Sequence, residues 1–124
     1  MTQPFVYPFK VETAVTKYTF VKLGTLAGQI VPCGAGENAI GVAQTDGAAG
    51  SHVNVCLLGE TYIIAGAAIA TNTILKAVAS GHADDAAAIE GEYDLGLALE
   101  AATAANDQIK MLFGVGVNEV KNVV

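Results

Sequence analysis

The sequence repeats part of itself after about half of its length. The segment "TKYTFVKL" (residues 16–23) aligns with "ATNTILKA" (residues 70–77), 54 positions later. Farther along, "AIGVAQTDGAAGSHVNVCLLG" (39–59) aligns with "DLGLALEAATAANDQIKMLFG" (94–114) after small loop differences. Because the aligned segments keep their order, we expect the chain to be built from two copies of one structural unit.

Each copy has the alternation of apolar residues that is typical of β-strands. The halves run over about residues 14–59 and 68–114. In "HVNVCLL" and in "QIKMLF" every second residue is apolar and large, as in a strand with one buried face. The strand-like segments "AIGVAQT" and "YDLGLALE" precede these two across turn-rich residues. The pattern therefore predicts one antiparallel hairpin in each half.

Two glycines in matching positions indicate a tightly built sheet. Gly41 and Gly96 lie in the middle of corresponding predicted strands, where glycine marks a bulge or a close backbone approach. Closing the sheet on itself also removes exposed strand edges. We predict an all-β fold, a compact small β-barrel or sandwich built from two similar β-rich halves. It forms a single domain over residues 13–124, with a surface loop and one helical turn within 78–92.

The first twelve residues are expected to form an extended N-terminal arm. The segment "QPFVYPFKVE" carries three of the eight aromatic residues of the chain, and its prolines lack the N–H that a central strand needs. Such an arm either docks on another protein or folds back over its own barrel. We predict a contact with another protein chain through four residues of the arm: Phe5, Val6, Tyr7 and Phe9.

The charge of the chain argues against two classes of partner. Twelve acidic residues face six lysines, with no arginine, for a formal net charge of −6. Nucleic acids and anionic membranes are bound mainly through basic side chains, so neither is an expected partner. The start of the chain lacks the basic and long apolar regions of a signal peptide. Cys33 and Cys56 have no zinc-type spacing and are expected to be reduced and buried.

We find no set of residues that predicts catalysis, a cofactor or a metal. His52 begins a predicted strand, and His82 lies beside Asp84 and Asp85 in "GHADD", which offers too few oxygen ligands for calcium. The alternating carboxylates of residues 90–94 are typical of a solvated surface. The glycine-rich "GAGENAIG" lacks the Gly-Lys-Ser/Thr ending of a phosphate-binding loop. The chain is therefore not expected to be an enzyme.

The repeated blocks resemble those of the capsid cement, or head decoration, proteins of tailed bacteriophages. The first block runs from Gly41-Val42-Ala43 through Asp46 to Val55, and the second begins at Gly96 in "GLALEAA". The resemblance covers roughly residues 14–113. Where the family usually has Gly-Asp before the repeated strand, this chain has Lys-Tyr and Thr-Asn.

The resemblance implies a structural virion protein that is made in the host cytoplasm and binds the outside of an icosahedral head. It would bridge neighbouring subunits of the phage major capsid protein and stabilise the expanded head, as a homo-oligomer, often a trimer at local three-fold positions. The alternatives are another virion β module, such as a tail or carbohydrate- or receptor-binding protein, a nucleotide-dependent enzyme, or a β domain of an unrelated complex.

Overall fold

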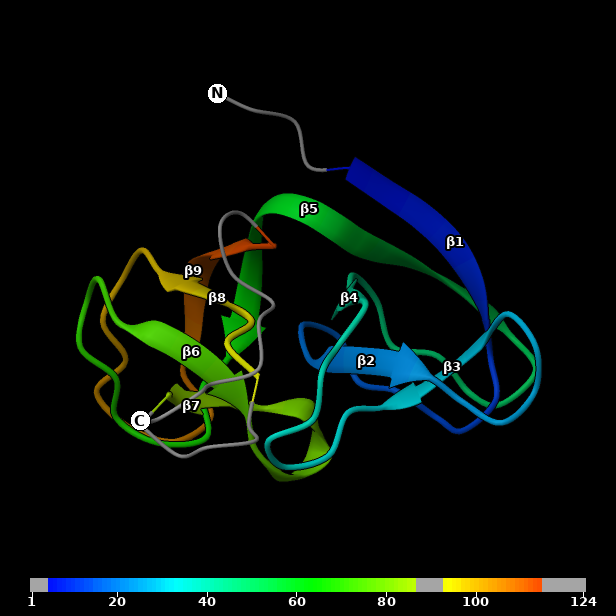
Figure 1. The fold of residues 1–124 in the computed structure, drawn as a ribbon, viewed down its shortest axis with the longest axis horizontal. Coiled ribbons are helices and arrows are strands. Elements are labelled where there is room, and N and C mark those ends of the chain that lie inside the picture. Colours follow the sequence, from blue (N-terminus) through cyan, green and yellow to red (C-terminus); the bar gives the residue numbers. More distant parts are fainter. Residues whose placement is uncertain (1–4, 87–92, 115–124) are drawn as a thin grey trace.

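The structure, a computed structural model, describes residues 5–86 and 93–114. Within these ranges the chain forms nine strands and one short 3-10 turn (Figure 1). In chain order they are β1 (Phe5–Val11), β2 (Phe20–Leu23), β3 (Gln29–Pro32), β4 (Gly41–Ala43), β5 (His52–Ile64), β6 (Ile74–Ala77), η1 (Ala79–Gly81), β7 (Ala83–Asp85), β8 (Gly96–Ala98) and β9 (Gln108–Phe113). The predicted all-β class is confirmed, and no helix in the described ranges is long and apolar enough to cross a membrane.

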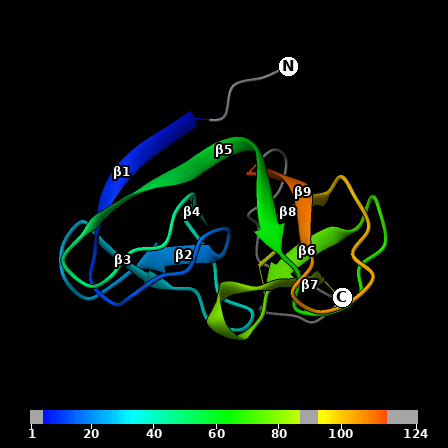
Figure 2. The same ribbon diagram turned by 180° about the vertical axis from the view of Figure 1, so that it is seen from behind.

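The strands form two small barrels that share β5. Barrel one is the closed ring of β1, β3, β2, β4 and the first half of β5. Barrel two consists of the second half of β5 with β9, β8, β6 and β7, and a parallel bridge between Ala65 and Ala83 completes its ring. Figure 1 shows β1–β4 on one side and β6–β9 on the other, with β5 extending over both. From behind, β5 follows β1 and then turns down beside β9 (Figure 2).

The two barrels have matching ladder registers. The row Phe20–Val42–Cys56 across β2, β4 and β5 corresponds to a row across β6, β8 and β9. That second row is Ile74–Leu97–Leu112. The antiparallel pairing of β1 with the first half of β5 likewise corresponds to the antiparallel pairing of the second half of β5 with β9. The matching registers therefore begin at residues 6 and 60, earlier than the sequence alignment indicated.

Both predicted hairpins are present, as β4–β5 and β8–β9. The close backbone approach expected at the two interior glycines is also found. A Cβ atom on Gly41 would collide with the carbonyl oxygen of Cys56, and one on Gly96 would lie 2.7 Å from that of Leu112. No side chain fits at either place, so glycine is required where β4 and β8 cross their neighbours.

Each barrel has an apolar interior, and the two interiors correspond position by position. Seven buried residues fill barrel one: Val11, Val15, Val21, Ile30, Ala43, Val53 and Val55. Their counterparts in the registers above all belong to a larger cluster in barrel two: Ala65, Ile69, Leu75, Ala83, Ala98, Ile109 and Met111. The same cluster includes residues of barrel one that pack on barrel two, so the second interior is continuous with the contact between the barrels.

Pro8 pairs with Asn54 within β1, at a place where β5 is the only neighbouring strand among the described residues, so it does not occupy a central strand. Successive residues of a strand direct their N–H groups to opposite sides. Val11 donates toward β5, to Ser51 at 2.8 Å, whereas the next residue donates toward β3. Pro8 therefore directs its nitrogen to the β3 side, where β3 reaches only the last two residues of β1. No ladder bond is lost there, and Pro4 lies outside the described residues.

The expected surface loop with a helical turn is wrong in part. Ala83–Asp85 forms strand β7, which pairs with β6 through Ala77, Lys76 and Leu75. Ala83 is fully buried in barrel two, and this burial decides the local structure. A strand of three residues is too short to show a period of two in the sequence.

Candidate functional site

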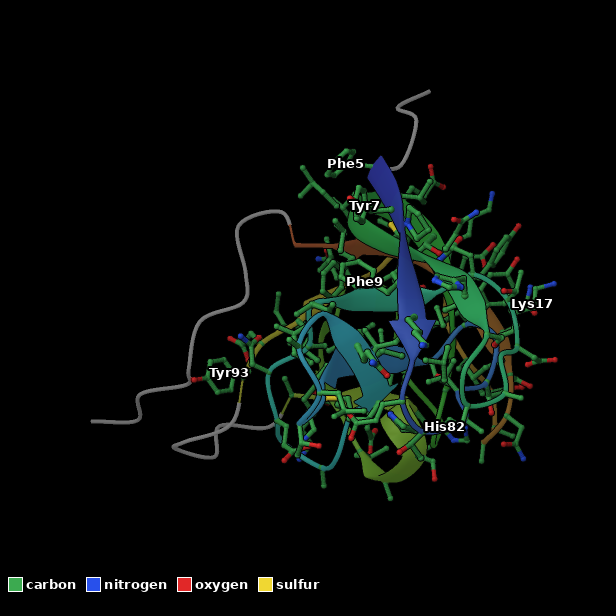
Figure 3. All side chains as sticks on the ribbon, turned by 90° about the vertical axis from the view of Figure 1, so that its right-hand side faces the viewer. Phe5, Tyr7, Phe9, Lys17, His82 and Tyr93 are labelled. Atoms are coloured by element: carbon green, nitrogen blue, oxygen red, sulfur yellow. The ribbon has the colours of Figure 1, made fainter. Side chains whose placement is uncertain are left out.

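The four predicted contact residues lie along β1, the strand nearest the start of the chain. Figure 3 shows Phe5, Tyr7 and Phe9 one after another, with Phe5 nearest the free end. Phe5 is 59% exposed, Tyr7 56% and Val6 41%, while Phe9 is half-buried. Large apolar side chains this exposed are typical of protein contact surfaces when they lie together.

The aromatic residues form a continuous surface. The rings of Tyr7 and Phe9 meet edge to face, with centroids 5.6 Å apart. Phe5 pairs across the strands with Leu58, which is 47% exposed, at a bulge in the ladder. Val6 alternates with these residues and lies on the opposite face of the strand. We call the exposed residues Phe5, Val6, Tyr7 and Leu58 the β1 tip.

The face that carries Tyr7 and Phe9 also borders an uncovered end of barrel one. Phe9 packs against the interior of this barrel together with Ile40 and Leu57, and all three are half-buried. On the N-terminal side of Lys10, β1 has no neighbour other than β5 among the described strands. The strand therefore projects past the ring, and its inner face remains open.

The histidines and acidic residues do not assemble into a reactive centre. His52 is the exposed first residue of β5, as expected for a rim position, and His82 follows η1. In residues 5–86 and 93–114 no three His, Cys, Asp or Glu side chains come together as a metal site requires. Glu90 and Glu92 lie outside the described residues.

The glycine-rich loop between β3 and β4 is occupied by a side chain of its own. The backbone N–H of Gly34 donates to the carboxylate of Glu37 at 2.6 Å, and Lys22 forms an ion pair with the same oxygen at 2.8 Å. The hydrogen bond from Lys22 and that from Gly34 lower the pKa of Glu37. An internal carboxylate thus takes the donors that a phosphate would need.

The two cysteines are free and buried on the face of barrel one that meets barrel two. Burial, with the nearby Glu37 carboxylate second, raises the pKa of the Cys33 thiol to about 12. Burial also raises the pKa of Cys56. Neither thiol forms the thiolate that a nucleophile requires near neutral pH.

Sequence reasoning missed the residues that complete the aromatic surface. Leu57 and Leu58 lie on β5, and Leu23 at the end of β2 is 53% exposed. The sequence alone carries no signal for them, but the structure does, because the counterpart of Leu57 is the buried Phe113 and that of Leu23 is the buried Ala77. Comparing burial between the halves, rather than letters alone, identifies them.

Comparison with known proteins gives two findings, and no curated protein matches the chain. The fold is similar to the crystal structure of the head fiber gp8.5 N base in bacteriophage phi29, with a TM-score of 0.75 and 18% identity over 94% of this chain and 99% of that one. At this identity the likeness shows a common fold. The sequence profile of the phage cement protein family matches residues 3–113. With nearly the whole described length matched, this chain belongs to the phage cement protein family.

Proposed function

We propose that this protein binds the outer surface of an icosahedral phage capsid and bridges neighbouring major capsid subunits to stabilise the expanded head. Its family is a family of structural phage proteins, and the solved structure it resembles is described as part of a head fiber. A non-enzymatic role on the virion follows from the same likeness. The observation that carries the proposal is the exposed apolar β1 tip.

The β1 tip is well suited to binding because it is already ordered. A free arm of about ten residues would lose roughly 10–20 kcal/mol of backbone entropy on docking. Phe5 and Tyr7 are held instead by the ladder between β1 and β5. Covering their exposed surface contributes roughly 6 kcal/mol at about 25 cal/mol per Å². A preordered surface retains most of that gain.

We place the predicted contact, to a capsid subunit or to a neighbouring copy of the chain, at Phe5, Val6, Tyr7 and Phe9. A homo-oligomer, such as a trimer at local three-fold positions, would present several tips at once. Binding through several linked sites is tighter than through one because each later contact is intramolecular. Modest contacts in each copy are then sufficient for stable decoration.

Binding to expanded, undecorated shells of the phage that encodes the protein tests this function. Removing residues 1–12 would delete β1 from barrel one, so point substitutions are needed. We expect saturable binding by the native chain, weakened at least tenfold in Phe5→Ala/Val6→Ala. The control is Leu26→Ala, because Leu26 is 54% exposed but lies in the turn between β2 and β3.

The possible results have separate meanings. No binding by the native chain would overturn the proposal, and glycan binding in its place would favour a carbohydrate-recognising virion module. Native-level binding by the double variant would leave the function standing but move the capsid contact away from the β1 tip.

A further inference from the structure

The contact between the two barrels joins the outer face of barrel one to an end of barrel two. On barrel one, the row Phe20–Val42–Cys56 is fully buried and belongs to the cluster that fills barrel two. The ring of Phe20 lies 6.1 Å from that of Phe113 at the end of β9. Close by, the Gln44 amide donates to the Thr61 hydroxyl at 2.9 Å. The outer face of one barrel thus covers an end of the other.

Both sides of this contact have uncovered counterparts elsewhere in the molecule. The covered end of barrel two includes Ile63, Leu95 and Phe113, all buried. By register and hydrogen bonding, their counterparts at the end of barrel one are the half-buried residues Phe9, Ile40 and Leu57.

The covering face has a counterpart too. The buried row of barrel one corresponds to Ile74, Leu97 and Leu112 on the outer face of barrel two. These three side chains are half-buried. Within residues 5–86 and 93–114, one pair of surfaces is therefore in contact, and a second pair of the same design is not.

The unused pair is more apolar than the used pair. Gln44 corresponds to Leu99, since their N–H groups donate to matching residues of β5 and β9. Thr61 corresponds to Tyr7, since Thr61 pairs with Met111 and Tyr7 pairs with Val55, which is the counterpart of Met111. The hydrogen-bonded pair inside the molecule is thus replaced by Leu99, 39% exposed, and Tyr7, 56% exposed. Apolar residues at exposed positions are explained when another surface covers them.

We propose that copies of this chain associate head to tail, with the outer face of barrel two in one copy covering the open end of barrel one in the next. The outer face is Ile74, Leu97, Leu99 and Leu112, and the open end is Tyr7, Phe9, Leu23, Ile40 and Leu57. The two surfaces differ, so the interface is heterologous and closes into a ring when the rotation between copies permits.

We assign a second copy of the chain as the partner of the open end because the chain itself has the matching outer face. The inference deepens the homo-oligomer of the proposed function and does not require capsid binding. It also divides the predicted contact residues. Tyr7 and Phe9 belong to the interface between copies. Val6 corresponds to the polar Glu60, and Phe5 lies beyond the bulge where the two registers part, so these two residues remain for the capsid.

Sedimentation velocity of the full chain and of two variants tests the interface without any shell. Tyr7→Lys disables the open end and Leu99→Lys disables the outer face, and both side chains are exposed enough for the fold to persist. We expect an oligomer for the native chain and for the control Leu26→Lys, and a monomer for each variant alone. Mixing the two variants should give a one-to-one dimer, because one intact interface remains between them.

Several outcomes would overturn the inference. These are a monomeric native chain, an oligomer that survives Leu99→Lys, or a mixture of variants that stays monomeric. Assembly only after removal of residues 115–124 would show that the chain's own end covers the outer face. Circular dichroism verifies folding, and Leu23→Lys replaces Tyr7→Lys if that variant unfolds. Shell binding is scored separately, so failure of the interface and failure of the capsid function are distinguishable.

Discussion

The two barrels have the same strand order and register, yet their ends differ. The end of barrel two at Phe113 is buried against Phe20 of barrel one, whereas the end of barrel one at Leu57 is half-buried and open. The interiors differ accordingly. Valine predominates in barrel one, and the larger Leu75 and Met111 lie in the cluster that spans barrel two and the contact. Two sets of strands with the same pairing therefore bury the same positions only if the structure packed against them is also the same.

The largest expected difference between the barrels is at their ends. Phe113→Ala removes a buried ring that contacts Phe20 and should lower the free energy of unfolding by about 3–5 kcal/mol. At the matching place, Leu57→Ala removes a half-buried side chain and should cost about 1–2 kcal/mol. Urea unfolding of both variants measures the difference. The comparison is made in the monomeric Leu99→Lys background, where equal losses would mean that the end of barrel one is covered within a single copy as well.

The two crossing glycines provide the next test. In Gly41→Ala the new methyl group meets the rigid Cys56 carbonyl and lies 2.5 Å from Cγ1 of Val55. In Gly96→Ala it meets the terminal methyl of Met111, which can rotate away, and lies 2.7 Å from the Leu112 carbonyl. We expect losses of about 3 and about 2 kcal/mol, respectively. Thermal unfolding checks the order, and a costlier Gly96→Ala would show that Met111 does not move.

Alkaline pH should destabilise barrel one in particular. Because the pKa of Cys33 is raised in the fold, its stabilising contribution is complete below the unfolded pKa and is lost as pH rises toward about 12. The loss between pH 9 and 10 is about 1 kcal/mol. The counterparts of Cys33 and Cys56, which are Ala86 and Leu112, do not titrate. Cys33→Ala should flatten the alkaline decline in unfolding free energy, and an unchanged slope would contradict this.

Acidic pH should have the smallest effect, and it should involve both barrels. The Leu26 and Thr25 groups that hydrogen-bond to Glu12 lower its pKa, and Thr103 does the same for Asp107. These contributions are present above the unfolded pKa values, near 4, and are lost as pH falls through the folded ones. Glu12→Gln and Asp107→Asn should each reduce the decline in stability below pH 4. If one of the two variants declines in stability as much as the native chain does, the turn that carries its substitution is not stabilised in this way.

The sequence was sufficient for the features that depend on local pattern. Alternation in residues 53–58 and 108–113 placed both hairpins on the right segments. Gly41 and Gly96 marked the two crossings because nothing larger fits there. The resemblance to cement proteins, carried by the repeated blocks, agrees with the family match.

The features that depend on distant neighbours could not be predicted. Pro8 is acceptable in β1 only because its nitrogen faces the side that β3 does not reach. Gly59 is the last residue of the first predicted half, but it lies, with φ of 114°, within the continuous strand β5. Of the proposed contact residues, Phe5, Val6 and Tyr7 can be predicted from the sequence because they are apolar or aromatic and lie together near the start of the chain. Leu57 and Leu99 cannot, since their meaning depends on comparing the two barrels.

The continuous strand β5 has a mechanical consequence for a molecule that is pulled from both sides. Its thirteen residues have a backbone length of about 43 Å at roughly 3.3 Å each, so one stretch of backbone runs through both barrels. A tension along this strand is carried as shear over the ladders with β1 and β9. In that geometry the hydrogen bonds resist together, whereas in a hairpin pulled open from its end they break one after another. The shared strand therefore acts as a tie between the barrels, which no flexible linker could provide.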